Sequence, residues 1–119
     1  METKEEGVEF LAGRWQELNQ KLRSQFKKEL NLEAILFLIG VRELGQGSRE
    51  YTKEEKRDLM HVAICAILAP SGFFRLSHQD KEGWPHWETV KPFPFADVFS
   101  QEVFLKSHIV DYFAPIYDI

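Results

Sequence analysis

Two histidines and a carboxylate between residues 78 and 88 are the side chains of this chain whose types and spacing best suit chemistry. His78 and His86 flank Asp80–Gly83, whose composition predicts the turn of a β-hairpin. If this is a type I turn with a bulged glycine, His78 faces His86 directly and Glu88 lies diagonally on the same face. Two imidazoles and a carboxylate are suitable ligands for zinc or another divalent metal. A one-residue shift in register would separate the histidines, so an ordinary solvated hairpin tip is the favoured alternative.

The same stretch contains a dense group of aromatic and rigid residues. They follow the predicted turn without interruption: Trp84, Pro85, His86 and Trp87. Aromatic side chains are enriched at protein interfaces, so these four residues are predicted to form an exposed aromatic edge that binds a partner protein or a second copy of the chain. The competing interpretation is that the tryptophans cover the helices beneath them.

One further group resembles a nucleophilic site. Asp58, His61 and Cys65 share a face of a predicted helix, at steps of three and four residues. This arrangement supplies no oxyanion donors, and the simpler interpretation is a solvated stripe beside a buried thiol. Gly45–Ser48 follows a helix instead of a strand, which argues against a nucleotide site. The sequence therefore assigns no catalytic residue and no cofactor.

Basic residues recur along the first predicted helix and suggest a third function, as a nucleic-acid accessory protein. Three are spaced by seven residues, with two more nearby: Arg14, Lys21, Lys28, Arg23 and Lys27. The net charge of the chain is −4, and an acidic protein repels nucleic acid as a whole. A solvated helix face is thus the favoured interpretation, and a nucleic-acid partner is not expected.

The elements that position these residues begin with two helices. An amphipathic pattern predicts a helix over about Gly7–Leu30, and an almost continuous apolar pattern predicts a buried helix over Leu32–Leu44. Asn31 is a suitable N-cap for the second helix, and Gly45 a suitable left-handed C-cap. Since no Gly or Pro separates the two helices, one kinked helix remains an alternative.

A third helix is predicted from Thr52 to about Ala69. Thr52 and Glu55 have the spacing of a capping box, and Pro70 closes the segment. Its small residues would let another backbone approach, and Gly40 is the position expected to do so.

The C-terminal half adds a hairpin and a last helix. The hairpin is predicted over Phe73–Lys91, with Pro85 on an edge or irregular strand. Ser100 is the expected cap of a helix that gives way to a short tail from Ala114, interrupted by Pro115. The resulting order is α-α-α-β-β-α, an α+β fold with a mostly helical core and one β-hairpin packed on it.

Composition sets the class of protein. A chain of 119 residues with 44% apolar residues predicts a single domain over residues 1–119. The apolar runs are shorter than the roughly 18–20 residues of a membrane span, and Cys65 is the single cysteine, so a cytoplasmic protein without membrane contact is expected. Helices that are apolar on all sides need covering, which predicts a homo-oligomer, most simply a two-fold dimer through the first helix or the hairpin edge. A compact monomer is the alternative.

Three segments also carry a resemblance. Asn31–Val41, Thr52–Met60 and Gly83–Trp87 are similar to those of a family of short bacterial proteins, of Bacteroidetes type, without an assigned function. The resemblance spans about Asn31–Phe113 and implies a small bacterial cytoplasmic protein. It brings no site residues. The sequence as a whole therefore predicts a non-enzymatic interaction or scaffold module, with a metal-binding protein or metal-dependent enzyme as the alternative.

Overall fold

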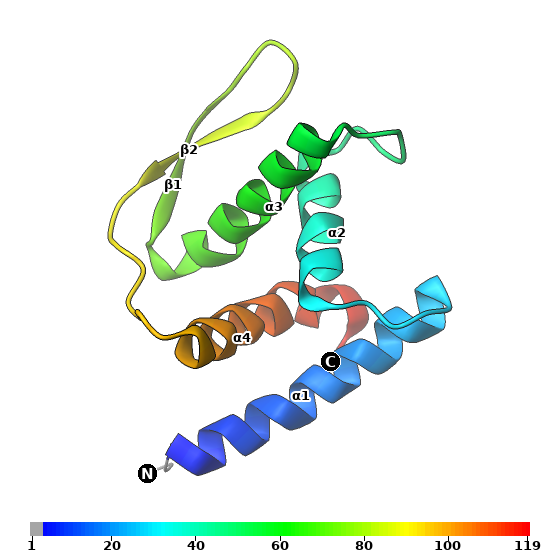
Figure 1. Cartoon of the computed structure of the whole chain (residues 1–119), viewed down its shortest axis with the longest axis vertical. Helices are drawn as coiled ribbons and strands as arrows, with labels where there is room; N and C mark the ends of the chain where they lie inside the picture. The colour runs from blue at the N-terminus through cyan, green and yellow to red at the C-terminus, as the bar shows by residue number, and fades with distance from the viewer. Residues whose placement is uncertain (1–3) are drawn as a thin grey trace. The chain divides into compact units, whose positions relative to one another are not determined.

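The computed structural model describes residues 4–119 and contains four α-helices and one two-stranded antiparallel sheet in that range (Figure 1). The elements are α1 (Lys4–Phe26), α2 (Leu32–Leu44), α3 (Lys53–Leu68), the 3₁₀ turn η1 (Ala69–Ser71), β1 (Phe74–Gln79), β2 (Pro85–Thr89) and α4 (Val98–Tyr117). The predicted α+β class and the order α-α-α-β-β-α are confirmed.

These elements group into two compact units. The first, called here the α1–α4 unit, consists of the chain up to Leu30 together with Phe95–Ile119. The second, the hairpin unit, is Asn31–Pro94 and contains α2, α3 and both strands. The single domain expected from the length of the chain stays a prediction.

In the α1–α4 unit, the two helices pack against each other and run in the same direction (Figure 1). Near the middle, Arg14 Nη1 lies 3.1 Å from Asp111 Oδ1, and towards the C-terminal ends the Tyr117 hydroxyl donates to Gln25 Oε1. The buried apolar side chains of this unit are Leu18, Leu22, Ile109, Val110 and Phe113. The apolar face predicted for the first helix is therefore half to fully buried.

The C-terminal end of α1 and the N-terminal cap of α4 differ from the prediction. α1 ends at Phe26 instead of Leu30, because Lys27 adopts a left-handed φ of 62°. The Lys27 amide donates a hydrogen bond to the Arg23 carbonyl and so ends the helix. α1 and α2 are thus separate helices. α4 is capped by Asp97 and not by Ser100, since the Asp97 carboxylate accepts the Ser100 amide at 2.8 Å.

The expected tail after Ala114 is also part of α4. The helix continues through Pro115 to Tyr117. Proline removes one amide donor from the helix, and it lies within the last turn, where only two more helical residues follow.

The hairpin unit begins with the caps that the sequence predicted. Asn31 Oδ1 accepts the Ala34 amide at 2.8 Å, and Gly45 closes α2 with a φ of 73°. At the start of α3, Thr52 Oγ1 accepts the Glu55 amide at 3.1 Å, and Glu55 Oε1 accepts the Thr52 amide at 2.9 Å. This reciprocal pair is the predicted capping box.

The two helices of this unit meet at Gly40. A Cβ atom on this glycine would lie only 2.1 Å from the Leu59 carbonyl oxygen on α3. The predicted close approach at Gly40 is therefore present, but its partner is the backbone of Leu59, not the small residues that follow it in α3. Several apolar side chains of α2 are only half-buried, including Phe37, Leu38 and Val41, so α2 is less completely covered than its sequence predicted.

Within residues 4–119, no helix is long and apolar enough to cross a membrane.

Candidate functional site at the hairpin tip

The hairpin tip is held in place by the side chain of Asp80. Its Oδ1 accepts the backbone amides of Glu82 at 2.9 Å and Trp84 at 3.0 Å. The Gly83 amide donates a hydrogen bond to the Asp80 carbonyl at 3.0 Å. Gly83 has a φ of 89°, a conformation that glycine adopts readily. This hydrogen-bond pattern is that of the predicted turn with a bulged glycine.

The register brings the two histidines together. His78 pairs with His86, and their imidazole rings stack with centroids 4.7 Å apart and planes inclined by 2°. Beyond this pair a bulge between Leu76 and His78 shifts the register by one residue. Arg75 therefore lies opposite Glu88, and its Nη2 lies 2.6 Å from Glu88 Oε2.

The bulge changes the predicted metal site. His78 and His86 meet as expected, whereas Glu88, the third candidate ligand, is paired with a guanidinium that the sequence pattern did not place there. His86 Nε2 also lies 2.9 Å from Asp80 Oδ2. Across residues 4–119, no three His, Cys, Asp or Glu side chains are grouped so that they could hold a metal ion.

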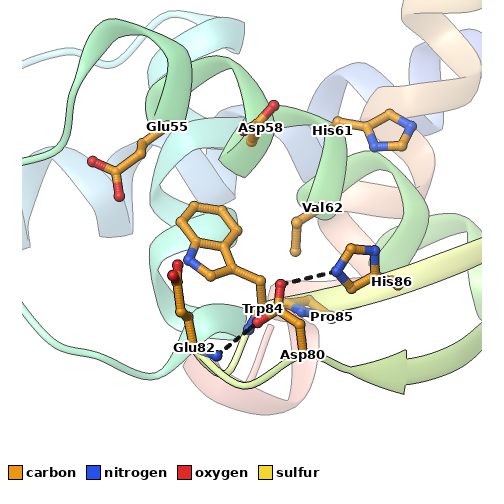
Figure 2. A pocket seen from close by; sticks show the side chains of 9 residues that line it. All are labelled: Glu55, Asp58, His61, Val62, Asp80, Glu82, Trp84, Pro85 and His86. Atoms are coloured by element: carbon orange, nitrogen blue, oxygen red, sulfur yellow. Dashed lines mark hydrogen bonds and ion pairs between the residues drawn. The ribbon is translucent and has the colours of Figure 1, made fainter.

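A groove of about 450 Å³ lies between the hairpin tip and α3 (Figure 2). α3 contributes Glu55, Asp58, His61 and Val62, and the hairpin contributes Asp80, Glu82, Trp84, Pro85 and His86. In Figure 2 the Trp84 indole lies between the carboxylates of α3 and those of the turn. All of these residues belong to the hairpin unit, so this unit forms the groove by itself.

A contact from the α2–α3 loop fixes the tip from a third direction. Gln46 Nε2 donates to the Glu82 carbonyl at 2.7 Å. The Asp80 side chain holds the turn together, and the Gln46 contact joins the turn to the α2–α3 loop. The position of the turn therefore depends on a contact between residues that are 36 positions apart in the sequence.

Two of the four carboxylates in the groove are engaged by hydrogen bonds. The Thr52 amide and the Arg49 guanidinium hold the pKa of Glu55 below its usual value. The hydrogen bond to His86, followed by that from the Trp84 amide, lowers the pKa of Asp80. Both groups are therefore stabilised in their ionised form.

The other two carboxylates, those of Asp58 and Glu82, have no hydrogen-bond or ion-pair partner among the side chains and backbone groups that the structure describes. No Lys or Arg side chain lines the groove. The groove is thus negatively charged, with two carboxylates free to bind a cation.

The four residues of the predicted aromatic edge have different surroundings in the structure. Trp84, Pro85 and His86 line the groove, whereas Trp87 is not among the lining residues and pairs with Leu76 across the strands. His86 and Trp87 are consecutive residues of β2, so their side chains point to opposite faces of the hairpin. The Trp87 indole nitrogen is buried and has no hydrogen-bond partner among the described residues.

The three residues of the predicted nucleophilic group, Asp58, His61 and Cys65, also differ in their surroundings. Asp58 and His61 are exposed and line the groove, whereas Cys65 is fully buried. Burial raises the pKa of the Cys65 thiol to about 11, and His61 Nε2 lies 3.8 Å from its sulfur. A thiol with this pKa is protonated at neutral pH, which argues against a nucleophilic role.

The basic stripe on the first helix is shorter than predicted. Arg14 pairs with Asp111, and Arg23 Nη2 lies 2.6 Å from Glu29 Oε1. Lys28 lies beyond the end of α1, so the seven-residue spacing does not continue on one helix face. Acidic neighbours thus reduce the cationic character of this surface.

Sequence reasoning did not identify the acidic lining of the groove. Asp80 and Glu82 were assigned only to a turn, and Glu55 only to a helix cap. Their convergence depends on how the hairpin packs on α3, and the only local signal was the pair of carboxylates flanking Lys81.

No family model matches this chain, and neither does any curated protein or solved structure. The resemblance to short bacterial proteins stays a prediction. The functional argument therefore depends on the geometry of the hairpin unit.

Proposed function

We propose that the protein is a non-enzymatic interaction module that binds a segment of a partner protein in the groove between α3 and the hairpin tip. The observation that carries this proposal is the half-buried Trp84 indole, which with Pro85 and His86 forms one wall of an open groove of about 450 Å³. Binding sites of proteins have volumes of this order and combine an apolar wall with a few polar groups.

Preorganisation supports a binding role. The turn that carries Trp84 is fixed by the Asp80 carboxylate and by Gln46, so little conformational entropy is lost when a ligand binds. The lining of the groove includes no Ser, Thr or Cys side chain, and the Cys65 thiol is buried with a raised pKa, which favours binding over nucleophilic catalysis. As a protein with one cysteine, buried in the fold, it is proposed to work in the cytoplasm.

The protein is also proposed to form a two-fold homodimer. Large apolar side chains of the α1–α4 unit are exposed, with Val98 at 70%, Phe10 at 65% and Phe99 at 61%. Exposed apolar side chains of this size are typical of subunit interfaces. Native mass spectrometry of the untagged protein, prepared without chelator, tests this proposal. A dimer without extra mass supports it, and a monomer at micromolar concentration contradicts it.

The same measurement tests the metal-binding alternative, which the facing imidazoles of His78 and His86 favour. Additional mass equal to a metal ion, lost when both histidines are replaced by alanine, would place this alternative first.

A selection from a random peptide library tests the binding proposal directly. Peptides are selected on the immobilised protein and then measured against the Trp84→Leu variant, which keeps an apolar side chain but removes the indole. Peptides that bind the wild type and lose affinity for the variant support the proposal. A selection that enriches no peptide sensitive to this substitution contradicts it.

A further inference from the structure

We propose that the partner segment binds by a lysine or arginine side chain, whose stem packs on the Trp84 indole and whose cationic group binds between the carboxylates of Asp58 and Glu82. This inference rests on the proposed function, because it names the chemistry of the segment that the groove binds.

The charge of the groove is the first argument. Its lining includes four carboxylates and no Lys or Arg side chain. Arg49 contacts Glu55, and His86 contacts Asp80, which leaves Asp58 and Glu82 as the two carboxylates without partners among the described residues. A concave surface concentrates the field of such charges, and a cation gains most where no protein cation competes.

The aromatic wall is the second argument and is independent of the charge. The Trp84 indole lies between the carboxylates of α3 and those of the turn (Figure 2). Tryptophan has the strongest attraction of all side chains for a cation over its ring face. Val62 and Pro85 add apolar surface beside it. Lys and Arg are the side chains that combine a long apolar stem with a terminal cation, so they match both features.

The combination of free carboxylates and an aromatic wall favours a basic side chain over a metal ion or a purely apolar peptide. A bare metal ion needs several ligands around one point, and among residues 4–119 no three His, Cys, Asp or Glu side chains are so arranged. A purely apolar peptide would leave the two free carboxylates buried without partners, which costs free energy. A basic side chain satisfies the carboxylates and covers the indole at the same time.

The peptide selection described above separates the failure of this inference from that of the proposed function. Enrichment of Lys or Arg in the peptides that require Trp84 supports the inference. Enrichment of apolar or acidic peptides that require Trp84 contradicts the inference and leaves the binding function in place. A selection without any peptide that requires Trp84 contradicts both.

Affinity measurements then identify the groups involved. The probe is a fluorescein-labelled glycine-serine peptide with one central lysine, compared with the same peptide carrying acetyl-lysine, which keeps the stem but removes the charge. We expect the acetylated peptide to bind about tenfold more weakly, since one cation–π contact in a partly desolvated site has roughly this effect.

The matched variants are Asp58→Asn with Glu82→Gln in the groove and Glu17→Gln with Glu43→Gln at exposed positions that do not line it. Both pairs remove two negative charges from the whole chain. We expect the groove pair to weaken lysine binding about tenfold and to reduce its salt dependence, and the control pair to leave affinity within about twofold. An equal loss in both pairs would show that only the net charge attracts the peptide, and this would contradict the inference.

Substitutions of Trp84 test the ring itself. Trp84→Phe keeps an aromatic face, and Trp84→Leu keeps only apolar volume. We expect affinity for the lysine peptide to decrease from Trp to Phe to Leu, because Phe attracts a cation more weakly than Trp and Leu does not attract it through a ring. Equal binding by all three proteins, with circular dichroism showing that all are folded, would contradict a role for the indole.

Discussion

The glycines in the two helix pairs of this protein differ in what surrounds them. In the hairpin unit, Gly40 of α2 lies against the backbone of Leu59, so close that a Cβ atom would overlap the carbonyl oxygen. In the α1–α4 unit, Gly13 lies in the middle of α1 and a Cβ atom there would meet nothing within 4 Å. Glycine in the first pair permits packing, whereas glycine in the second pair only weakens a helix.

This difference corresponds to different roles of the two units. The hairpin unit has a capped helix pair, a fixed turn and the groove, all of which need defined geometry. The α1–α4 unit is joined by apolar side chains and a few exposed polar contacts, and it leaves Phe10, Val98 and Phe99 exposed. These features are the basis of the proposals that the hairpin unit binds a peptide and that the α1–α4 unit self-associates.

The largest expected effect compares the cores of the two units. Leu59→Ala and Leu18→Ala each truncate a side chain that is fully buried. We expect each substitution to lower the free energy of unfolding by about 2–5 kcal/mol, measured by urea denaturation.

The shape of these transitions tests whether the two units are independent. If residues 1–119 form a single domain, both substitutions shift the same cooperative transition. Two transitions, each shifted by only one of the substitutions, would show that the units unfold separately and that the single-domain prediction is wrong.

The next largest effect on stability is expected from replacing Gly40 and Gly13 by alanine. Gly40→Ala forces a methyl group towards the Leu59 carbonyl, 2.1 Å from the Cβ position, where backbone must move to admit it. We expect a loss of about 1–3 kcal/mol in the free energy of unfolding. Gly13→Ala is the matched control, because it makes the same change in an open helix position and is expected to stabilise the protein by up to about 1 kcal/mol.

Equal effects of the two substitutions in urea denaturation would break the comparison. They would show that Gly40 has room for a side chain and that the α2–α3 contact is looser than its geometry indicates.

What the sequence predicted well was local. The N-caps Asn31 and Thr52 and the C-cap Gly45 bind groups within four residues, so their pattern can be recognised in a short segment. The facing of His78 and His86 was predicted because a turn of defined length fixes the pairs next to it. The element order followed from such local signals.

What the sequence did not reveal depended on contacts between distant segments or on small differences between neighbouring residues. The bulge between Leu76 and His78 has no local signature, and it alone placed Arg75 opposite Glu88. The acidic groove requires α3 to lie beside the turn, which no spacing encodes. At the start of α4, Asp97 and Ser100 are both good capping residues, and the sequence pattern favoured the wrong one.

A smaller effect tests this last assignment and extends the comparison to helix ends. Asp97→Ala removes the carboxylate that accepts the Ser100 amide, and Ser100→Ala is its control three residues away. We expect Asp97→Ala to cost about 1 kcal/mol in the free energy of unfolding. Ser100→Ala should cost much less, because its side chain does not cap the helix. The reverse order in urea denaturation would restore Ser100 as the cap.

The smallest effect is expected when the pH is lowered and the carboxylates of the hairpin unit take up protons. Asp80 and Glu55, both in the hairpin unit, have pKa values below their usual ones because their ionised forms accept hydrogen bonds. A carboxyl group whose pKa is lower in the folded chain stabilises the fold above its unfolded pKa of about 4, and this contribution is lost as the pH falls through the folded-state pKa. We therefore expect the amide signals of Glu82 and Trp84 in NMR spectra to change below about pH 4, as Asp80 takes up a proton.

Asp80→Asn identifies the group responsible for that change. Asparagine keeps an oxygen for the amides of Glu82 and Trp84 but does not ionise, so the acid-dependent change at the turn should disappear while the turn itself persists. If the change persists in this variant, it belongs to another carboxyl group, with Glu55 the first to replace. Glu55 comes first because it also lies in the hairpin unit and because hydrogen bonds to its ionised form lower its pKa, as they do for Asp80.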